Sequence, residues 1–170
     1  MIHVSSLRGL PELASSLGTF DLLTLLSPAA EPLDQGALVR GRHLHLTFHD
    51  IAELRPDLIA PDAGLMRAIL DFGRDTPEAC PLLIHCWAGI SRSSAAAYAI
   101  ACDRNAGYED AIADELRRRS PYVTPNKLMV HLADEALGRG GRMTEAIERI
   151  GRGADAAEGL PYQLPLRWPI

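Results

Sequence analysis

The sequence predicts an α/β protein with a mainly parallel central sheet flanked by helices. Short apolar runs are typical of buried strands, longer stretches carry apolar residues at helical spacing, and the two kinds of segment alternate. The chain has 170 residues, of which 47% are hydrophobic and 23% charged, so it is long enough to bury one substantial core.

Proline and glycine separate the elements in the first half of the chain. Residues 20–26 form an apolar run that closes before Pro28, which predicts a buried strand. Residues 42–48 alternate, with Leu44 and Leu46 on one face. We therefore expect strands at residues 3–5, 20–26 and 42–48, helices at 10–17 and 63–73, and loops at 29–41 and 50–61.

The second half contains one more strand and a series of helices. Residues 82–84 are apolar and precede an alanine-rich stretch, 93–101, whose small side chains would let a helix approach the sheet closely. Further helices are expected at residues 108–119, 126–137 and 143–150. We divide the chain into a domain over residues 1–150 and a tail over 151–170 that contains glycine and proline. This tail either packs on its own domain or embraces a partner subunit, as in a homodimer.

Residues 85–93, His-Cys-Trp-Ala-Gly-Ile-Ser-Arg-Ser, connect the last strand to the alanine-rich helix. Such a loop offers unpaired backbone N–H groups beside the positive end of a helix dipole, so it can cradle a tetrahedral oxyanion. Cys86 at its base should be held as a thiolate nucleophile. Arg92 presents a planar fork that matches two phosphate oxygens.

The other residues of this loop have supporting roles. Gly89 lets the backbone curl without a steric clash. The Ser93 hydroxyl could stabilise the cysteine sulfur as a leaving group, and His85 could hydrogen-bond the loop carbonyls. Substrate oxygens would be bound by the loop as a whole, which comprises Trp87, Ala88, Gly89, Ile90, Ser91 and Arg92.

The pattern His-Cys-x-x-Gly-x-x-Arg-Ser at residues 85–93 resembles the signature of the cysteine-dependent protein tyrosine phosphatase superfamily, with flanks most similar to its small dual-specificity branch. The arginine-rich turn at residues 117–126 is similar to this branch as well. The resemblance implies a phosphoric monoester hydrolase with a phosphocysteine intermediate and phosphotyrosine or phosphoserine/threonine proteins as substrates. It implies phosphate or sulfate binding in the loop and no cofactor. No His/Cys cluster has metal-ligand spacing, and no metal is expected.

Cleavage of a phosphate ester by a thiolate also needs an acid that protonates the leaving oxygen. In the family this acid is an aspartate on a loop upstream of the cysteine. Asp50 follows the strand expected at 42–48 and matches that position, so it is our candidate. Asp57 and Asp62 are rivals. Asp62 follows Pro61 at the start of a helix, where an N-cap role explains it.

The composition of the loop bears on the choice of substrate and on rival functions. Trp87, Ala88 and Ile90 stand where some relatives carry lysines for extra phosphates, which disfavours highly charged inositides, and Ser94 replaces a proline common in relatives. A rhodanese- or arsenate-reductase-like enzyme would use a similar anion loop, as would a catalytically weak module that only binds phosphate. The residues that flank the loop and the acid candidate favour the phosphatase.

Charge and cysteine content bear on partners and compartment. The net charge of −5 disfavours nucleic acids and anionic membranes, and no apolar run approaches the length of a membrane span. The three cysteines, Cys80, Cys86 and Cys102, are too few for a disulfide framework and suit a reducing compartment. We therefore expect a cytoplasmic protein in which Cys80 and Cys102 are packing residues, and a redox role for either stays open.

Overall fold

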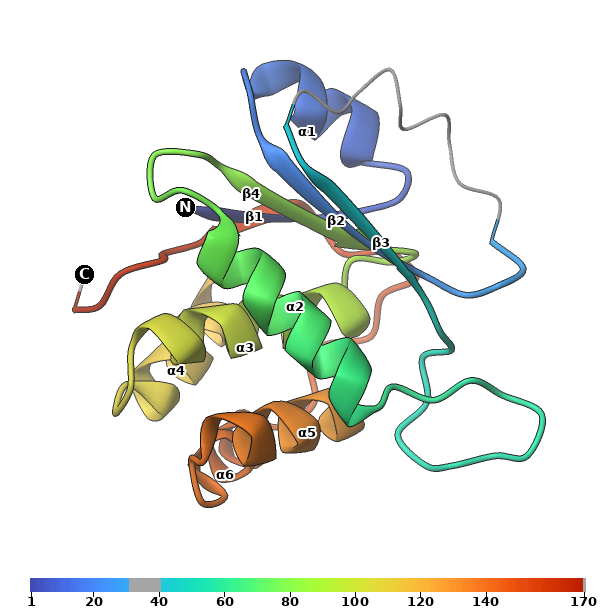
Figure 1. The fold of residues 1–170 in the computed structure, drawn as a ribbon, viewed down its shortest axis with the longest axis vertical. Helices are drawn as coiled ribbons and strands as arrows, with labels where there is room; N and C mark the ends of the chain where they lie inside the picture. The colour runs from blue at the N-terminus through green and yellow to red at the C-terminus, as the bar shows by residue number, and fades with distance from the viewer. Residues whose placement is uncertain (31–40, 170) are drawn as a thin grey trace.

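A five-stranded sheet forms the centre of the molecule in the computed structural model, which describes residues 1–30 and 41–169 (Figure 1). Its spatial order is β3-β2-β4-β1-β5. The strands are β1 (Ile2–Ser6), β2 (Asp21–Leu26), β3 (His43–Thr47), β4 (Leu82–Cys86) and β5 (Tyr162–Leu164). β1 to β4 pair in parallel, whereas β5 pairs antiparallel with β1. The predicted α/β class with a mainly parallel sheet is confirmed.

Helices cover both faces of this sheet unequally (Figure 1). α1 (Leu10–Ser16) packs on one face. The helical layer on the other face consists of α2 (Ala63–Asp75), α3 (Arg92–Arg104), α4 (Glu109–Arg119), α5 (Lys127–Leu137) and α6 (Arg142–Ile150). Side chains alternate along each strand, so that Leu23 and Ile84 join the large core with α3, whereas Leu22 and Leu83 join the small core with α1.

Small residues let α3 pack at the centre of the large core. Its fully buried alanines are Ala95, Ala96, Ala97, Ala99 and Ala101. α2 approaches α3 closely at Gly73, where a Cβ would lie 2.8 Å from carbon atoms of Ile100. The Tyr98 hydroxyl donates to the Glu109 carbonyl at 3.1 Å and ties α3 to the start of α4. These contacts fix α3 with its N-terminus at the carboxyl end of β4.

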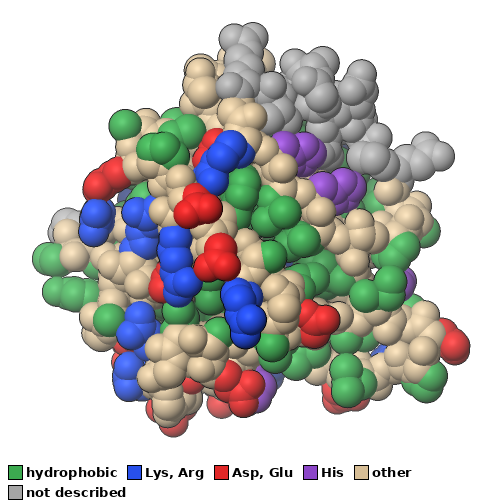
Figure 2. Space-filling model, in the orientation of Figure 1, with side chains coloured by type: hydrophobic (Ala, Val, Ile, Leu, Met, Phe, Trp, Pro, Cys, Tyr) green, Lys and Arg blue, Asp and Glu red, His purple; other side chains and the backbone are tan. Residues whose placement is uncertain are grey.

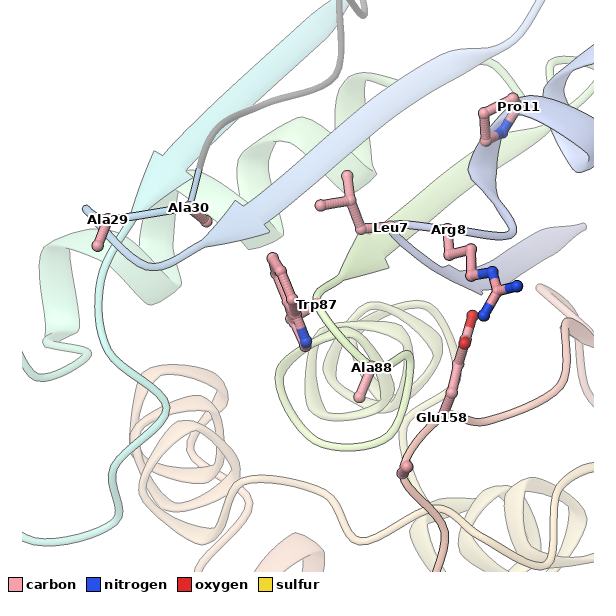
Figure 3. Close-up of a pocket in the computed structure, with 9 residues that line it drawn as sticks. Leu7, Arg8, Pro11, Ala29, Ala30, Trp87, Ala88 and Glu158 are labelled. Carbon is pink, nitrogen blue, oxygen red and sulfur yellow. The ribbon is translucent and has the colours of Figure 1, made fainter.

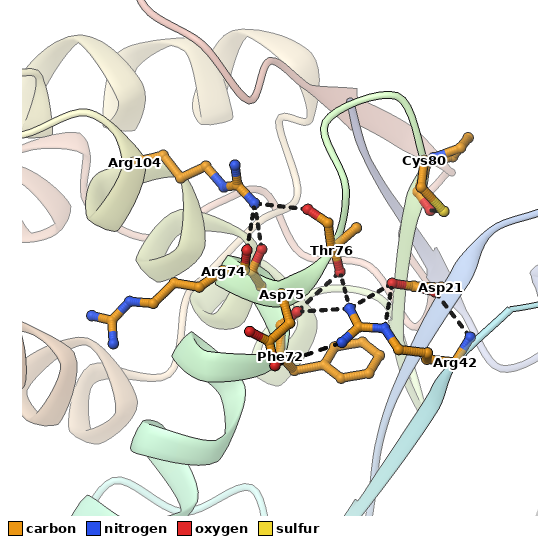
Figure 4. A network of polar contacts seen from close by, with 10 residues as sticks. Asp21, Arg42, Phe72, Arg74, Asp75, Thr76, Cys80 and Arg104 are labelled. Atoms are coloured by element: carbon orange, nitrogen blue, oxygen red, sulfur yellow. Dashed lines mark hydrogen bonds and ion pairs between the residues drawn. The ribbon is translucent and has the colours of Figure 1, made fainter.

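A polar network joins the edge strand β3 to the helical layer (Figure 4). Asp21 on β2 accepts hydrogen bonds from the Arg42 guanidinium at 2.7 Å and from the Arg42 backbone N–H at 2.9 Å. Burial opposes ionisation of Asp21, but the bonds from Arg42 outweigh it and lower the pKa of Asp21. Arg42 also donates to the Thr76 hydroxyl at 3.0 Å, and Arg104 donates to the Thr76 carbonyl at 2.9 Å. The network thus fixes the strand that leads to Asp50.

The elements expected within the described residues all occur, with ends that differ by a few residues. The loop predicted at residues 29–41 falls mostly on 31–40, outside the described part of the chain, whereas 50–61 is irregular as predicted. The sequence pattern does not predict β5, because only three residues separate Pro161 from Pro165. Residues 162–164 pair with residues 2–4, so the tail packs on its own domain through this strand.

The face formed by the helices carries acidic and basic side chains side by side (Figure 2). Ion pairs between neighbouring helices include Arg74–Asp103 and Arg149–Asp114, both at 2.7 Å, which join α2 to α3 and α6 to α4. Within the described residues, no helix combines the length and the apolar character needed to cross a membrane.

Candidate active site

The 86–92 loop lies at the carboxyl end of β4, between Cys86 as the last strand residue and Arg92 as the first helical one. At Gly89 the backbone φ is +72°, a value that residues with a Cβ rarely adopt. A Cβ there would also lie 2.8 Å from the backbone nitrogen of Ser6, at the end of β1. The turn therefore requires the glycine that the sequence pattern singles out.

The backbone carbonyls of this loop are bonded outward. They accept hydrogen bonds from N–H groups of surrounding segments: Trp87 from Leu7 (3.1 Å), Ala88 from Gly159 (2.9 Å), Ile90 from Thr124 (3.1 Å) and Ser91 from Asn126 (3.4 Å). The C=O and N–H of one trans peptide unit point in opposite directions, so the N–H groups that follow these carbonyls are turned into the loop. The result is a concave set of donors that suits an oxyanion.

Cys86 lies at the base of this concave surface and is only 2% exposed. Its Sγ accepts the Gly89 N–H at 3.3 Å and lies 3.2 Å from the Oγ of the buried Ser93. Ser91, the N-cap residue of α3, makes no side-chain cap bond to the helix, so the first N–H groups of α3 are available to an anion. Hydrogen-bond donors and a helix N-terminus are the surroundings in which a thiolate is stabilised.

The Arg92 guanidinium is held in place by hydrogen bonds to other segments of the protein. Its Nη1 donates to the Phe48 carbonyl at 2.8 Å and to the Ser27 hydroxyl at 3.1 Å, and its Cζ lies 5.6 Å from the centre of the Phe48 ring. Arg92 is 4% exposed, and its buried Nε has no hydrogen-bond partner among the described residues. A planar fork fixed through one nitrogen retains donors for the oxygens of a phosphate.

Asp50 lies on the irregular segment after β3, beside the 86–92 loop. Its Oδ1 accepts hydrogen bonds from the Ser91 hydroxyl and from the Asn126 side-chain amide, both at 2.8 Å. Asn126 also donates to the Ile51 carbonyl at 3.1 Å and caps α5 by accepting the Met129 N–H at 3.0 Å. The carboxylate is therefore held by the loop and by α5, although Asp50 itself is exposed at the surface.

A cavity of about 550 Å³ brings the predicted catalytic groups together. Cys86, Arg92 and Asp50 line it, together with residues that include Ser27, Trp87 and Ser91.

Neither rival aspartate is among the described residues that line this cavity. Asp57 is exposed further along the segment that follows Asp50. Asp62 accepts the Leu65 N–H at 2.7 Å as the N-cap of α2, which confirms its predicted capping role. The geometry favours Asp50 over both.

His85 is fully buried on β4, behind the loop. Its Nε2 lies 2.8 Å from the Thr24 hydroxyl on β2, which is also 2.9 Å from the Nε2 of His43. Burial lowers the pKa of His85 to about 4, so the imidazole is neutral at physiological pH. His85 therefore joins two strands beneath the site and adds no positive charge beside Cys86.

The three arginines at the end of α4, residues 117–119, make their contacts within the protein. Arg118 and Arg119 each donate to Glu115 at 2.6 Å. The Arg117 guanidinium donates to the Gly151 carbonyl at 2.7 Å, which ties α4 to the start of the tail. These contacts favour a structural role for the three arginines over one in substrate binding.

The other cysteines lie apart from the site. Cys80 precedes β4 and Cys102 is fully buried in α3, and both are free thiols. Burial raises the pKa of the Cys102 thiol. Over residues 1–30 and 41–169, no group of His, Cys, Asp and Glu side chains is arranged to hold a metal ion.

Sequence reasoning missed the Ser27 hydroxyl, the Phe48 carbonyl and the link from Asn126 to Asp50. Each contacts a site residue that lies tens of positions away in the sequence. Ser27 follows β2, which pairs with β4, so inspection of the residues after each parallel strand would have found it. No comparable signal in the sequence pattern singles out Asn126, which the structure shows to be the N-cap of α5.

No protein-family profile and no curated protein sequence matches the chain, but solved structures do. Tk-PTP in its active form has a TM-score of 0.53 at 22% identity, over 79% of this chain and 88% of that chain. PTPMT1 in complex with PI(5)P has a TM-score of 0.60 at 12% identity, over 88% and 92%. The human tyrosine phosphatase-like serine/threonine/tyrosine-interacting protein has a TM-score of 0.56 at 19% identity, over 82% and 92%.

At these identities the likeness establishes the fold. The chain has the fold of the cysteine-dependent protein tyrosine and dual-specificity phosphatases. The resemblance that the sequence shows at residues 85–93 is thereby confirmed at the level of the fold.

Proposed function

We propose that the chain is a phosphoric monoester hydrolase that forms a phosphocysteine on Cys86. The observation that carries the proposal is the convergence of the Cys86 thiol, the Arg92 guanidinium and the Asp50 carboxyl group on one cavity. These groups supply the nucleophile, the anion-binding fork and the proton donor that cleavage of a phosphate ester requires.

In the first step, the Cys86 thiolate attacks phosphorus on the side opposite the leaving oxygen. An S–P bond forms while the P–O bond breaks. Arg92 and the inward N–H groups of the 86–92 loop bind the other phosphate oxygens and stabilise the charge of the transition state. Asp50 protonates the departing oxygen, so that an alcohol leaves instead of an alkoxide. Within the described residues these hydrogen bonds are made to Oδ1 of Asp50, so Oδ2 is the oxygen that we assign to proton transfer.

In the second step, water attacks the phosphocysteine. Asp50 takes a proton from the water, an O–P bond forms, and the S–P bond breaks to release phosphate and the thiolate. The Ser93 hydroxyl, 3.2 Å from the sulfur, stabilises the departing thiolate with a hydrogen bond. One turnover therefore restores the starting protonation of both Asp50 and Cys86.

The proposed substrates are cytoplasmic proteins that carry phosphotyrosine or phosphoserine/threonine. Two neighbours bear on this choice, since one was solved with PI(5)P and another is described as serine/threonine/tyrosine-interacting. The present loop has no Lys or Arg between Cys86 and Arg92. It therefore offers no cationic side chain for a second phosphate, which disfavours highly phosphorylated inositides. A homodimer formed through the tail stays a prediction.

Hydrolysis of p-nitrophenyl phosphate tests the proposal. The wild-type chain should turn the ester over and Cys86→Ser should not, whereas Cys80→Ser, altered outside the site, should keep the activity. A wild-type chain that binds phosphate in a calorimeter without turnover would instead identify a binding module. Sulfur transfer from thiosulfate to cyanide would identify a rhodanese-like enzyme.

A further inference from the structure

A second cavity, of about 700 Å³, opens beside the catalytic one (Figure 3). Its walls are mostly apolar and come from segments far apart in the sequence. Leu7 lies in the turn after β1, Pro11 lies in α1, and Ala157 belongs to the tail. The charged residues at this cavity are Arg8 and Glu158, whose side chains point toward one another in Figure 3.

The two cavities are adjacent, because Ala29, Ala30, Trp87 and Ala88 line both of them. Trp87 directly follows the nucleophile, and 61% of its surface is exposed. Figure 3 shows its indole between the labels of Ala30 and Ala88, which also line both cavities. A ligand whose phosphate is bound above Cys86 can therefore extend past an aromatic face into an apolar space.

A neighbouring space, which shares Asp50 with the catalytic cavity, has a different character. This space is lined by the acid candidate Asp50 together with Glu53 and Arg55 on the same segment. An apolar group in that space would remain beside charged side chains and water, whereas on the Trp87 side it would lose contact with water. The structure thus gives a bound substrate a polar side and an apolar side.

We propose that the second cavity binds an apolar extension of the substrate's own leaving group, namely an aromatic ring beyond the one that carries the phosphate. This inference rests on the proposed function, since the 86–92 loop must hold the phosphate. The exposed Trp87 indole gives the ring a flat partner, and the alanines leave room for it. The enzyme should accordingly prefer phosphomonoesters of extended aromatic alcohols over those of a single ring.

The test compares 4-biphenylyl phosphate with phenyl phosphate, whose leaving groups have similar acidity, so that a difference reports binding of the extra ring. We expect the wild-type chain to have a kcat/KM about tenfold higher for the biphenylyl ester, as for other apolar groups in fitting pockets. Ala157→Phe fills the second cavity and should bring the ratio of the two constants close to one. Its matched control, Ala156→Phe, alters an exposed neighbour outside the cavity lining and should keep the ratio.

Equal kcat/KM values for the two esters would overturn this inference and leave the proposed function intact. If the chain hydrolysed neither ester, the proposed function would be contradicted. Calorimetry of ester binding to Cys86→Ser would then decide the role of the second cavity. Tighter binding of the biphenylyl ester would support the inference that the second cavity binds the extra ring, and equal binding of both esters would overturn that inference. A dimer in sedimentation that Ala157→Phe dissociates would assign the cavity to a second copy of the chain and also overturn the inference.

Discussion

The two ends of α3 differ in how their polar groups are satisfied. At the C-terminal end, the buried Asn105 donates to the carbonyls of Ala101 at 2.8 Å and Leu166 at 3.0 Å, and it accepts the Trp168 N–H at 3.0 Å. At the N-terminal end, the helix has no side-chain cap, and the buried Arg92 Nε is unpaired among the described residues. The C-terminal cap is thus bonded by the protein itself, whereas the N-terminal donors beside the catalytic cavity are not.

This difference separates what stabilises the fold from what binds a ligand. Buried donors without partners cost free energy, and native structures contain few of them. Around Cys86, the uncapped first N–H groups of α3 and the Arg92 Nε lie at one cavity, which indicates that an anion completes the network there. A ligand that binds only the folded state also stabilises it. The C-terminal end gains its stability from the tail instead, through residues near 166–168.

Removing the acid should produce the largest effect at the N-terminal end. Asp50→Asn keeps the shape of the side chain and removes the proton, so kcat/KM for phenyl phosphate, which reports the first step alone, should fall by about 10²–10⁴-fold. The loss should be much smaller for difluoromethylumbelliferyl phosphate, whose acidic phenol leaves without help. Steady-state kinetics with both esters measure the difference.

Asp57→Asn is the matched control and should alter neither rate by more than about twofold, since most surface changes are mild. Equal losses for the two esters in Asp50→Asn would show that Asp50 is not the acid. A leaving-group dependence in Asp57→Asn would move the acid seven residues along the chain.

Replacing the Arg92 guanidinium, at the N-terminal end of α3, should have the next largest effect. Arg92→Lys keeps the charge but loses the planar, bidentate geometry and the contacts to Phe48 and Ser27. We expect turnover to fall by about 10²-fold, as for other lost transition-state contacts. Kinetics on p-nitrophenyl phosphate would check this, and near-normal activity would mean that the loop does not bind phosphate as described.

The cysteines associated with the two ends should differ in reactivity. Cys86 is surrounded by donors, whereas burial raises the pKa of Cys102 and keeps it a neutral thiol near pH 7. Iodoacetate should therefore label Cys86 at least about tenfold faster than Cys102 or Cys80, and phosphate should slow only the reaction of Cys86. Peptide mass spectrometry reads the rates. Uniform labelling that phosphate leaves unchanged would remove the proposed contrast.

A change at the C-terminal end should affect stability and spare activity. Asn105→Ala leaves the Leu166 carbonyl and the Trp168 N–H without their partner, so the free energy of unfolding should fall by about 1–3 kcal/mol. Urea denaturation measures the loss, and kcat/KM should stay within about twofold of the wild-type value. Glu148→Ala, at an exposed position on α6, serves as the control. A loss of activity without a loss of stability would contradict the division between the two ends.

The sequence predicted the parts of the site that local chemistry dictates. Cys86, Gly89 and Arg92 follow from one loop, because the turn and the anion cradle demand those residue types at that spacing. Asp50 is the candidate acid because its position after a strand matches the one that the family resemblance implies, and this assignment stays a prediction. The contact from Asn126 to Asp50 spans 76 positions and depends on how α5 packs, which no local pattern contains.

The same limit applies to the fold. Periodicity predicts the helices and the four parallel strands, because each buries a regular apolar pattern. β5 is too short for a period, and its place is decided by pairing with β1 at the other end of the chain. Long-range pairing of this kind is settled by the assembled sheet and not by the segment itself.

The central claim, that Cys86 carries the phosphoryl group during turnover, can be measured directly. In Asp50→Asn, p-nitrophenyl phosphate should still phosphorylate the cysteine, because its leaving group needs no acid, whereas hydrolysis of the intermediate lacks its base. Acid quenching during turnover followed by peptide mass spectrometry should then find a phosphoryl group on the peptide that contains Cys86. Turnover with no covalent intermediate, or with the phosphoryl group on a different residue, would contradict the account.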